Sequence, residues 1–167
     1  NDTVFTVRNV AVKFGEGAVN ELGYEAVQLD MERPLVITDE NISENTAIAD
    51  TVLYHLEEAG LEPTLYGGAP VEPTAAGVLA AIDFADKGKY DSFIGLGGGS
   101  SIDTAKMVNL YTTHPTGDFK DYIAPPTGGG KVVPGPLKPL LAVPTTAGTG
   151  SENTPVAVVD LVEEQLK

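Results

Sequence analysis

Three consecutive glycines followed by two serines form the part of this sequence best suited to chemistry. Gly97, Gly98 and Gly99 come directly after an apolar run, and Ser100 and Ser101 open a segment with helical spacing. Glycine has no Cβ to keep an anion away, and the first turn of a helix offers unpaired N–H groups and a positive dipole end. The pattern predicts a phosphate-binding turn, with a nucleotide as the first candidate ligand. The alternative is a tight turn whose glycines serve packing alone.

A second loop, rich in hydroxyl groups, also follows an apolar run. The segment 144–152 reads PTTAGTGSE and contains Thr145, Thr146, Thr149 and Ser151. If the preceding strands are parallel, this loop and the glycines lie at the same edge of a sheet, where one ligand can contact both. An ordinary polar loop is the alternative interpretation.

Two acidic residues complete the candidate cofactor-binding set. Asp39 follows the apolar run 35–38, where a carboxylate can hold ribose hydroxyls or can cap a helix or turn. Asp103 falls in the first turn of the helix after the glycines, where it either suits the dipole or accepts from a neutral part of a ligand. We predict no catalytic side chain and no metal site, because His55 and His114 are far apart and the chain has no cysteine.

The elements that would position these residues alternate between strand and helix. Strands are predicted at 3–7, 10–14, 35–38, 64–66, 92–96, 140–143 and 156–160. A helix is predicted at 44–59 with Ser43 as its cap, and another at 101–111 with Ser100 and Ser101 as caps. A third helix is predicted to begin after Thr74, which caps it, and to carry Leu79 on its inner face. The alternation predicts an α/β fold, a Rossmann-like parallel sheet with helices on both faces.

Composition and net charge indicate a folded domain that binds neither nucleic acid nor membranes. The chain has 167 residues, 42% of them apolar, which suffices for a domain with its own core. Its net charge of −14 repels nucleic acid and anionic membranes, so we expect neither as a partner. No apolar run approaches the ~20 residues of a membrane span. Dispersed acids, few lysines, no cysteine and no visible signal peptide predict a cytoplasmic protein of a salt-adapted organism.

The two loops together resemble the iron-containing, or group III, alcohol dehydrogenase family. The likeness rests on GGGSSIDTAK at 97–106, on PTTAGTGSE at 144–152 and on their separation. It covers the whole chain and implies a dinucleotide-binding domain over residues 1–167, with a helical metal-binding domain expected after it. Within the family, several segments are most similar to the hydroxyacid–oxoacid transhydrogenase branch: 71–74, 109–111, 118–122 and 136–140.

The resemblance implies a metal-dependent oxidoreductase that acts on an alcohol or hydroxyacid. It implies NAD or NADP as cofactor, with a divalent metal, iron or zinc, held in the full-length enzyme only; the present chain alone is expected to be inactive. An acid at position 39 would favour NAD by repelling the 2′-phosphate of NADP. The implied contacts are Gly97, Gly98, Gly99 and Ser100 for the diphosphate, Thr145, Thr146 and Thr149 near adenine and ribose, and Asp103 and Ser151 towards the nicotinamide.

Two other functions stay open at this point. One is a nucleotide- or phosphate-binding sensor module without catalysis. The other is a flavin-binding fold, which is less favoured because the glycines follow the third strand and no aromatic residue flanks them. A homo-oligomer is compatible with the sequence.

Overall fold

A parallel four-stranded sheet forms the centre of the molecule. The computed structural model describes residues 10–161. The strand order is β2-β1-β3-β4, and every neighbouring pair is parallel. The strand bounds are β1 Pro34–Ile37, β2 Thr64–Tyr66, β3 Ser92–Gly97 and β4 Leu140–Pro144.

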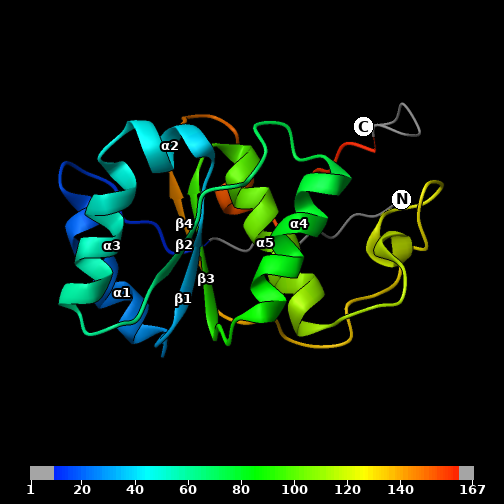
Figure 1. The fold of residues 1–167 in the computed structure, drawn as a ribbon, viewed down its shortest axis with the longest axis horizontal. Helices are drawn as coiled ribbons and strands as arrows, with labels where there is room; N and C mark the ends of the chain where they lie inside the picture. Colours follow the sequence, from blue (N-terminus) through cyan, green and yellow to red (C-terminus); the bar gives the residue numbers. More distant parts are fainter. Residues whose placement is uncertain (1–9, 162–167) are drawn as a thin grey trace, which may run out of the picture.

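Helices cover both faces of the sheet, as predicted from the alternation of elements (Figure 1). On one face lie η1 Ala18–Glu21, α1 Leu22–Gln28, α2 Glu40–Asn45 and α3 Ile48–Glu58. On the other lie α4 Ala75–Lys87 and α5 Gly99–Thr113. Two further 3-10 turns, η2 Phe119–Tyr122 and η3 Ser151–Asn153, flank β4 in the sequence. The α/β fold expected from the sequence is therefore confirmed.

The two central strands are apolar except for Ser92 at the start of β3, because both of their faces are covered. All residues of β1 and β3 are buried. Val36 and Ile94 pack into one cluster with Leu56, whereas Leu35 and Phe93 pack into the opposite cluster. Burying each such side chain contributes about 1.5–3 kcal/mol to the free energy of unfolding. The central strands thus contribute to both core clusters, and their pairing holds their carboxyl ends in fixed register.

Helix α5 packs unusually close to β3. A Cβ built on Gly95 would lie 2.9 Å from the Cα of Ile102 and 3.2 Å from the Cβ of Ala105. Real Cβ atoms do not approach backbone so closely, so glycine at this position allows the contact. The start of α5 is consequently fixed relative to the end of the strand that precedes it.

The predicted helix 44–59 is in fact two helices. The first, α2, begins at Glu40 with Asp39 as its cap, so Ser43 lies inside it and is not a cap. Thr46 ends this helix because its hydroxyl donates to the carbonyl of Ile42, at 2.9 Å, and accepts from the N–H of Ile48, at 3.2 Å. Such local side-chain bonds compete with helical ones. The second helix, α3, then runs from Ile48.

Four further expectations about elements or their buried faces are wrong or fall outside the described part. Residues 10–14 form no strand, and 156–160 contribute only an isolated bridge between Asp160 and Thr74. The predicted strand 3–7 lies outside the described residues. Leu79 is 46% exposed, because the buried face of α4 carries Val78 and Ala81. The helices within residues 10–161 are all too short or too polar to span a bilayer.

Candidate functional site

The sheet order reverses between β1 and β3, and the candidate residues gather where it does. The chain passes from β1 outward to β2 and then returns to the other side of β1 with β3. Ile37 lies opposite Gly95 in the register, so Asp39, just after β1, and Gly97, the last residue of β3, lie at neighbouring strand ends. In open α/β sheets, the crevice beyond such a reversal is where ligands bind.

The turn of residues 97–99, the glycine turn, joins β3 to α5 in a form that exposes backbone. Gly97 has a φ of +139°, and a Cβ there would lie 2.6 Å from the Oγ of Ser101. Gly98 is the N-cap of α5 and, having no side chain, gives the helix no side-chain cap. The N–H groups of the first turn have no partner within the helix. This helix start is therefore suited to receive an anion.

The loop of residues 145–153, the hydroxyl loop, lies directly against the glycine turn. The N–H of Thr145 donates to the carbonyl of Gly97 at 2.9 Å. A Cβ on Gly99 would lie 3.0 Å from the Oγ of Ser151, and one on Gly98 would lie 3.4 Å from the Oγ1 of Thr146. The expectation that both loops meet at one edge of the sheet is thus confirmed.

The hydroxyl loop leaves its threonines open to solvent. Thr145, Thr146 and Thr149 are exposed, and Ser151 is half-buried. The hydroxyl of Thr149 lies 3.3 Å from the Oε2 of Glu152. Exposed hydroxyls beside a helix N-terminus can donate to phosphate or accept from sugar hydroxyls.

The two serines after the glycine turn do not cap α5 as predicted. Because Gly98 already occupies the N-cap position, Ser100 and Ser101 lie inside the helix. The hydroxyl of Ser100 donates to the carbonyl of Val71, which ties the segment before α4 to the start of α5. Ser101 is buried. A phosphate contact from Ser100 therefore stays a prediction, and its backbone N–H is better placed for one than its hydroxyl.

Both predicted acids have partners within the protein. Asp39 caps α2 by accepting from the N–H of Ile42 at 3.1 Å, which bears out the capping interpretation. Asp103 is only 5% exposed. Its Oδ1 accepts from the Nζ of Lys106 at 3.0 Å and its Oδ2 from the N–H of Val158 at 3.0 Å. A ligand contact from either acid remains a prediction. The bond between Asp103 and Val158 was not indicated by the sequence.

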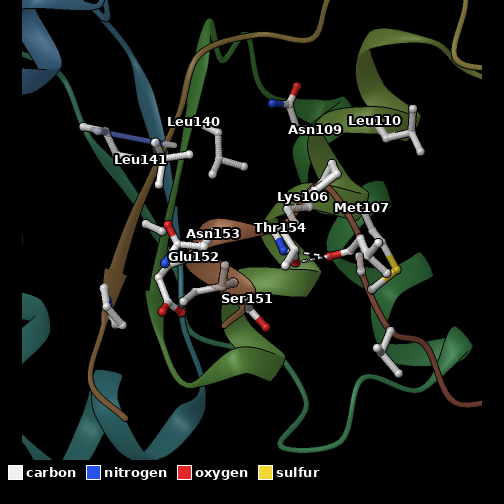
Figure 2. A pocket seen from close by; sticks show the side chains of 18 of the residues that line it. Lys106, Met107, Asn109, Leu110, Leu140, Leu141, Ser151, Glu152, Asn153 and Thr154 are labelled. Atoms are coloured by element: carbon white, nitrogen blue, oxygen red, sulfur yellow. Dashed lines mark hydrogen bonds between the residues drawn. The ribbon is translucent and has the colours of Figure 1, made fainter. Parts of the chain in front are cut away.

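A cavity of about 2130 Å³ extends from the hydroxyl loop along β4 and α5 (Figure 2). Thr145, Thr146 and Ser151 line it, together with apolar side chains such as Leu141 and Met107. Ligand pockets usually enclose about 300–1,000 Å³, so this space is wider than one small ligand requires. We place the candidate site at the rim of the cavity, where the hydroxyl loop meets the glycine turn.

An aromatic cluster borders the same cavity. The ring of Tyr111 stacks on Phe119, with centroids 4.9 Å apart, and meets Tyr122 edge-on. The hydroxyl of Tyr111 donates to the carbonyl of Phe119. Burial, assisted by Tyr122 and nearby carboxylates, raises the pKa of Tyr111 to about 12. A phenol with this pKa stays neutral and holds the segment around η2 against α5.

No metal site is present in the described part of the chain. Within residues 10–161, no group of three or more His, Cys, Asp or Glu side chains is arranged to hold an ion. These residues therefore do not fit a metal centre of their own.

The chain is similar to known proteins over almost its whole length. The family model described as iron-containing alcohol dehydrogenase matches residues 9–167. The mitochondrial hydroxyacid-oxoacid transhydrogenase of Xenopus laevis is 43% identical over 99% of this chain and 36% of that protein. The Homo sapiens protein of the same name is 39% identical, over 99% of this chain and 35% of its own length. A solved structure of an alcohol dehydrogenase from Oenococcus oeni superposes with a TM-score of 0.85 and 30% identity, covering 98% of this chain and 42% of that one.

Two facts follow from these comparisons. The chain spans about a third of the length of the curated relatives it matches. Those relatives are named as mitochondrial proteins, so the predicted cytoplasmic location in a salt-adapted organism is wrong. Net charge reports on solubility and on what a surface repels, and it does not specify a compartment.

Proposed function

This chain belongs to the iron-containing alcohol dehydrogenase family, and on that premise we propose that it is the dinucleotide-binding domain of a metal-dependent oxidoreductase. Members of the family use NAD(P) and iron. A domain that follows this one would supply the metal ligands. The substrate of the whole protein would be an alcohol or hydroxyacid. A hydroxyacid–oxoacid transhydrogenase is the candidate that the identity to the Xenopus laevis protein supports.

The observation that carries the proposal is the contact between the glycine turn and the hydroxyl loop at the reversal of the sheet. Gly98 places no side chain over the start of α5, and the exposed Thr146 flanks that start, with its Oγ1 3.4 Å from the position of a Cβ on Gly98. A diphosphate can approach the first-turn N–H groups, which the helix leaves unbonded. The residues present thus fit a dinucleotide.

Each part of the chain would then have a separate task. The backbone of Gly98, Gly99 and Ser100 would bind the diphosphate, and the threonines of the hydroxyl loop would orient the sugars. Asp39 would accept from the adenosine ribose hydroxyls and would repel a 2′-phosphate, which favours NAD over NADP. When bound, the nicotinamide ring accepts or donates the hydride of the reaction.

Calorimetric titration of the chain with NAD, NADP and FMN tests the proposal. We expect NAD to bind most tightly, NADP more weakly and FMN not at all. Preferential binding of FMN, or binding of inorganic phosphate as tightly as NAD, would contradict it. The latter result would favour a phosphate-binding module instead.

A further inference from the structure

A partly buried carboxylate–ammonium pair on α5 also bonds the segment that follows the hydroxyl loop. Asp103 and Lys106 are three residues apart on the helix, and their side chains are 8% and 14% exposed. The Nζ of Lys106 donates to Asp103 at 3.0 Å and also to the carbonyl of Val156 at 2.7 Å. The second carboxylate oxygen accepts from the N–H of Val158 at 3.0 Å.

The pair bonds the segment 154–160 as a neighbouring strand would. The ammonium of Lys106 donates to the carbonyl of Val156, and the carboxylate of Asp103 accepts from the N–H of Val158. In a parallel sheet, one residue of the neighbouring strand would bond to these same two backbone groups. Further along, Asp160 donates to the carbonyl of Pro73 at 2.8 Å and accepts from the N–H of Ala75 at 3.1 Å. This explains why the predicted strand 156–160 does not join the sheet, since side chains of α5 satisfy its backbone.

These bonds fix the far end of the hydroxyl loop. At its near end, Thr145 is bonded to Gly97. At its far end, Val156 is bonded to Lys106, and Figure 2 shows Thr154 beside that lysine. Between the two anchors, Gly148 and Gly150 have φ values of +90° and +74°, and no atom would lie within 4 Å of a Cβ at either. The middle of the loop therefore has little packing of its own to hold it.

We infer that Asp103 and Lys106 are positioning residues that hold segment 154–160 on α5 and so keep the hydroxyl loop against the glycine turn. The inference rests on the proposed function for its consequence, because a displaced loop would weaken dinucleotide binding. The anchoring itself depends only on the observed bonds.

Hydrogen exchange without cofactor tests the anchoring, and NAD titration tests its consequence. Lys106→Met keeps the apolar stem and removes the ammonium. Asp103→Asn keeps an acceptor for Val158 and removes the charge. We expect about tenfold faster exchange at 149–153 and at Val158 in Lys106→Met, with NAD binding weakened by about the same factor. Asp103→Asn should give a smaller change in the same direction.

Two matched variants show whether these effects are specific. Lys106→Arg keeps a cationic donor and should restore slow exchange. Lys87→Met breaks a comparable pair with Asp83, 2.6 Å apart but exposed, and should leave both measurements as in the unaltered protein. Unchanged exchange at 149–153 in Lys106→Met, or faster exchange that extends equally to α3, would overturn the inference. If the unaltered protein binds no NAD, the proposed function fails, while the exchange data still decide the anchoring.

Discussion

Substitution of Gly98 by alanine separates a role in binding from a role in folding. Gly98 has φ −75° and ψ −176°, a conformation that any residue adopts. A Cβ there would have one neighbour within 4 Å, the Oγ1 of Thr146 at 3.4 Å, which is ordinary contact. The packing of the protein itself therefore does not require glycine at this position.

The expected effects differ in size between stability and affinity. Alanine is a poorer N-cap than glycine, so we expect Gly98→Ala to lower the free energy of unfolding by about 1 kcal/mol. In a domain of this size that is a fall of about 2–4 °C in Tm. The new methyl group would stand between a phosphate and the first-turn N–H groups of α5. Losing one hydrogen bond to a charged group costs about 1.5–3 kcal/mol, or about 10- to 150-fold in Kd.

Calorimetric titration with NAD and thermal unfolding measure the two effects on the same sample. Gly117→Ala is the control, because a Cβ at Gly117 would meet no atom within 4 Å. Gly97→Ala should instead lower the thermal stability of the protein more than Gly98→Ala does, because the φ of +139° and the nearby Ser101 both oppose a side chain at position 97. A folded Gly98→Ala protein that binds NAD within about twofold of the unaltered protein would refute the assignment of the glycine turn to the diphosphate.

Three further outcomes are expected. Asp39→Ser keeps a good helix cap and removes the charge, so the ratio of NADP to NAD affinity should rise; an unchanged ratio in paired titrations would exclude the ribose role. Asn109 is 1% exposed, and its side chain is bonded to both the carbonyl and the N–H of Lys138. Asn109→Ala should lower the free energy of unfolding by about 2–3 kcal/mol in denaturant unfolding, and Asn45→Ala, at an exposed position, is the control. Because burial raises the pKa of Tyr111 from 10.0 to about 12, stability should be retained below pH 10 and fall as the pH rises towards 12. Tyr111→Phe should remove that component of the pH dependence, and an ultraviolet titration with an ordinary tyrosine midpoint would contradict the assignment.

Most elements of the fold were predictable because local patterns determine them. The buried strands β1 and β3 are continuous apolar runs, and Thr74 caps α4 as its position predicts. The predictions failed in two places for different reasons. Thr46 divides the helix expected at 44–59 through local bonds of its hydroxyl to Ile42 and Ile48, which compete with helical ones. Segment 156–160 bonds to side chains of α5 instead of the sheet, through contacts over 50 and 55 positions that the local sequence does not indicate.

From the amino-acid sequence we could predict which residues are able to bind a phosphate and that they follow strands of one parallel sheet. Their types and spacing were sufficient because glycine, hydroxyl residues and a helix start have the same properties in any fold. The folded structure was needed to show that Gly99 lies against Ser151, that Ser100 donates its hydroxyl to Val71, and that Asp103 bonds to Val158. These contacts join residues 29 to 55 positions apart, or lie between loops from different strands, so only the packing of β3, β4 and α5 brings them together.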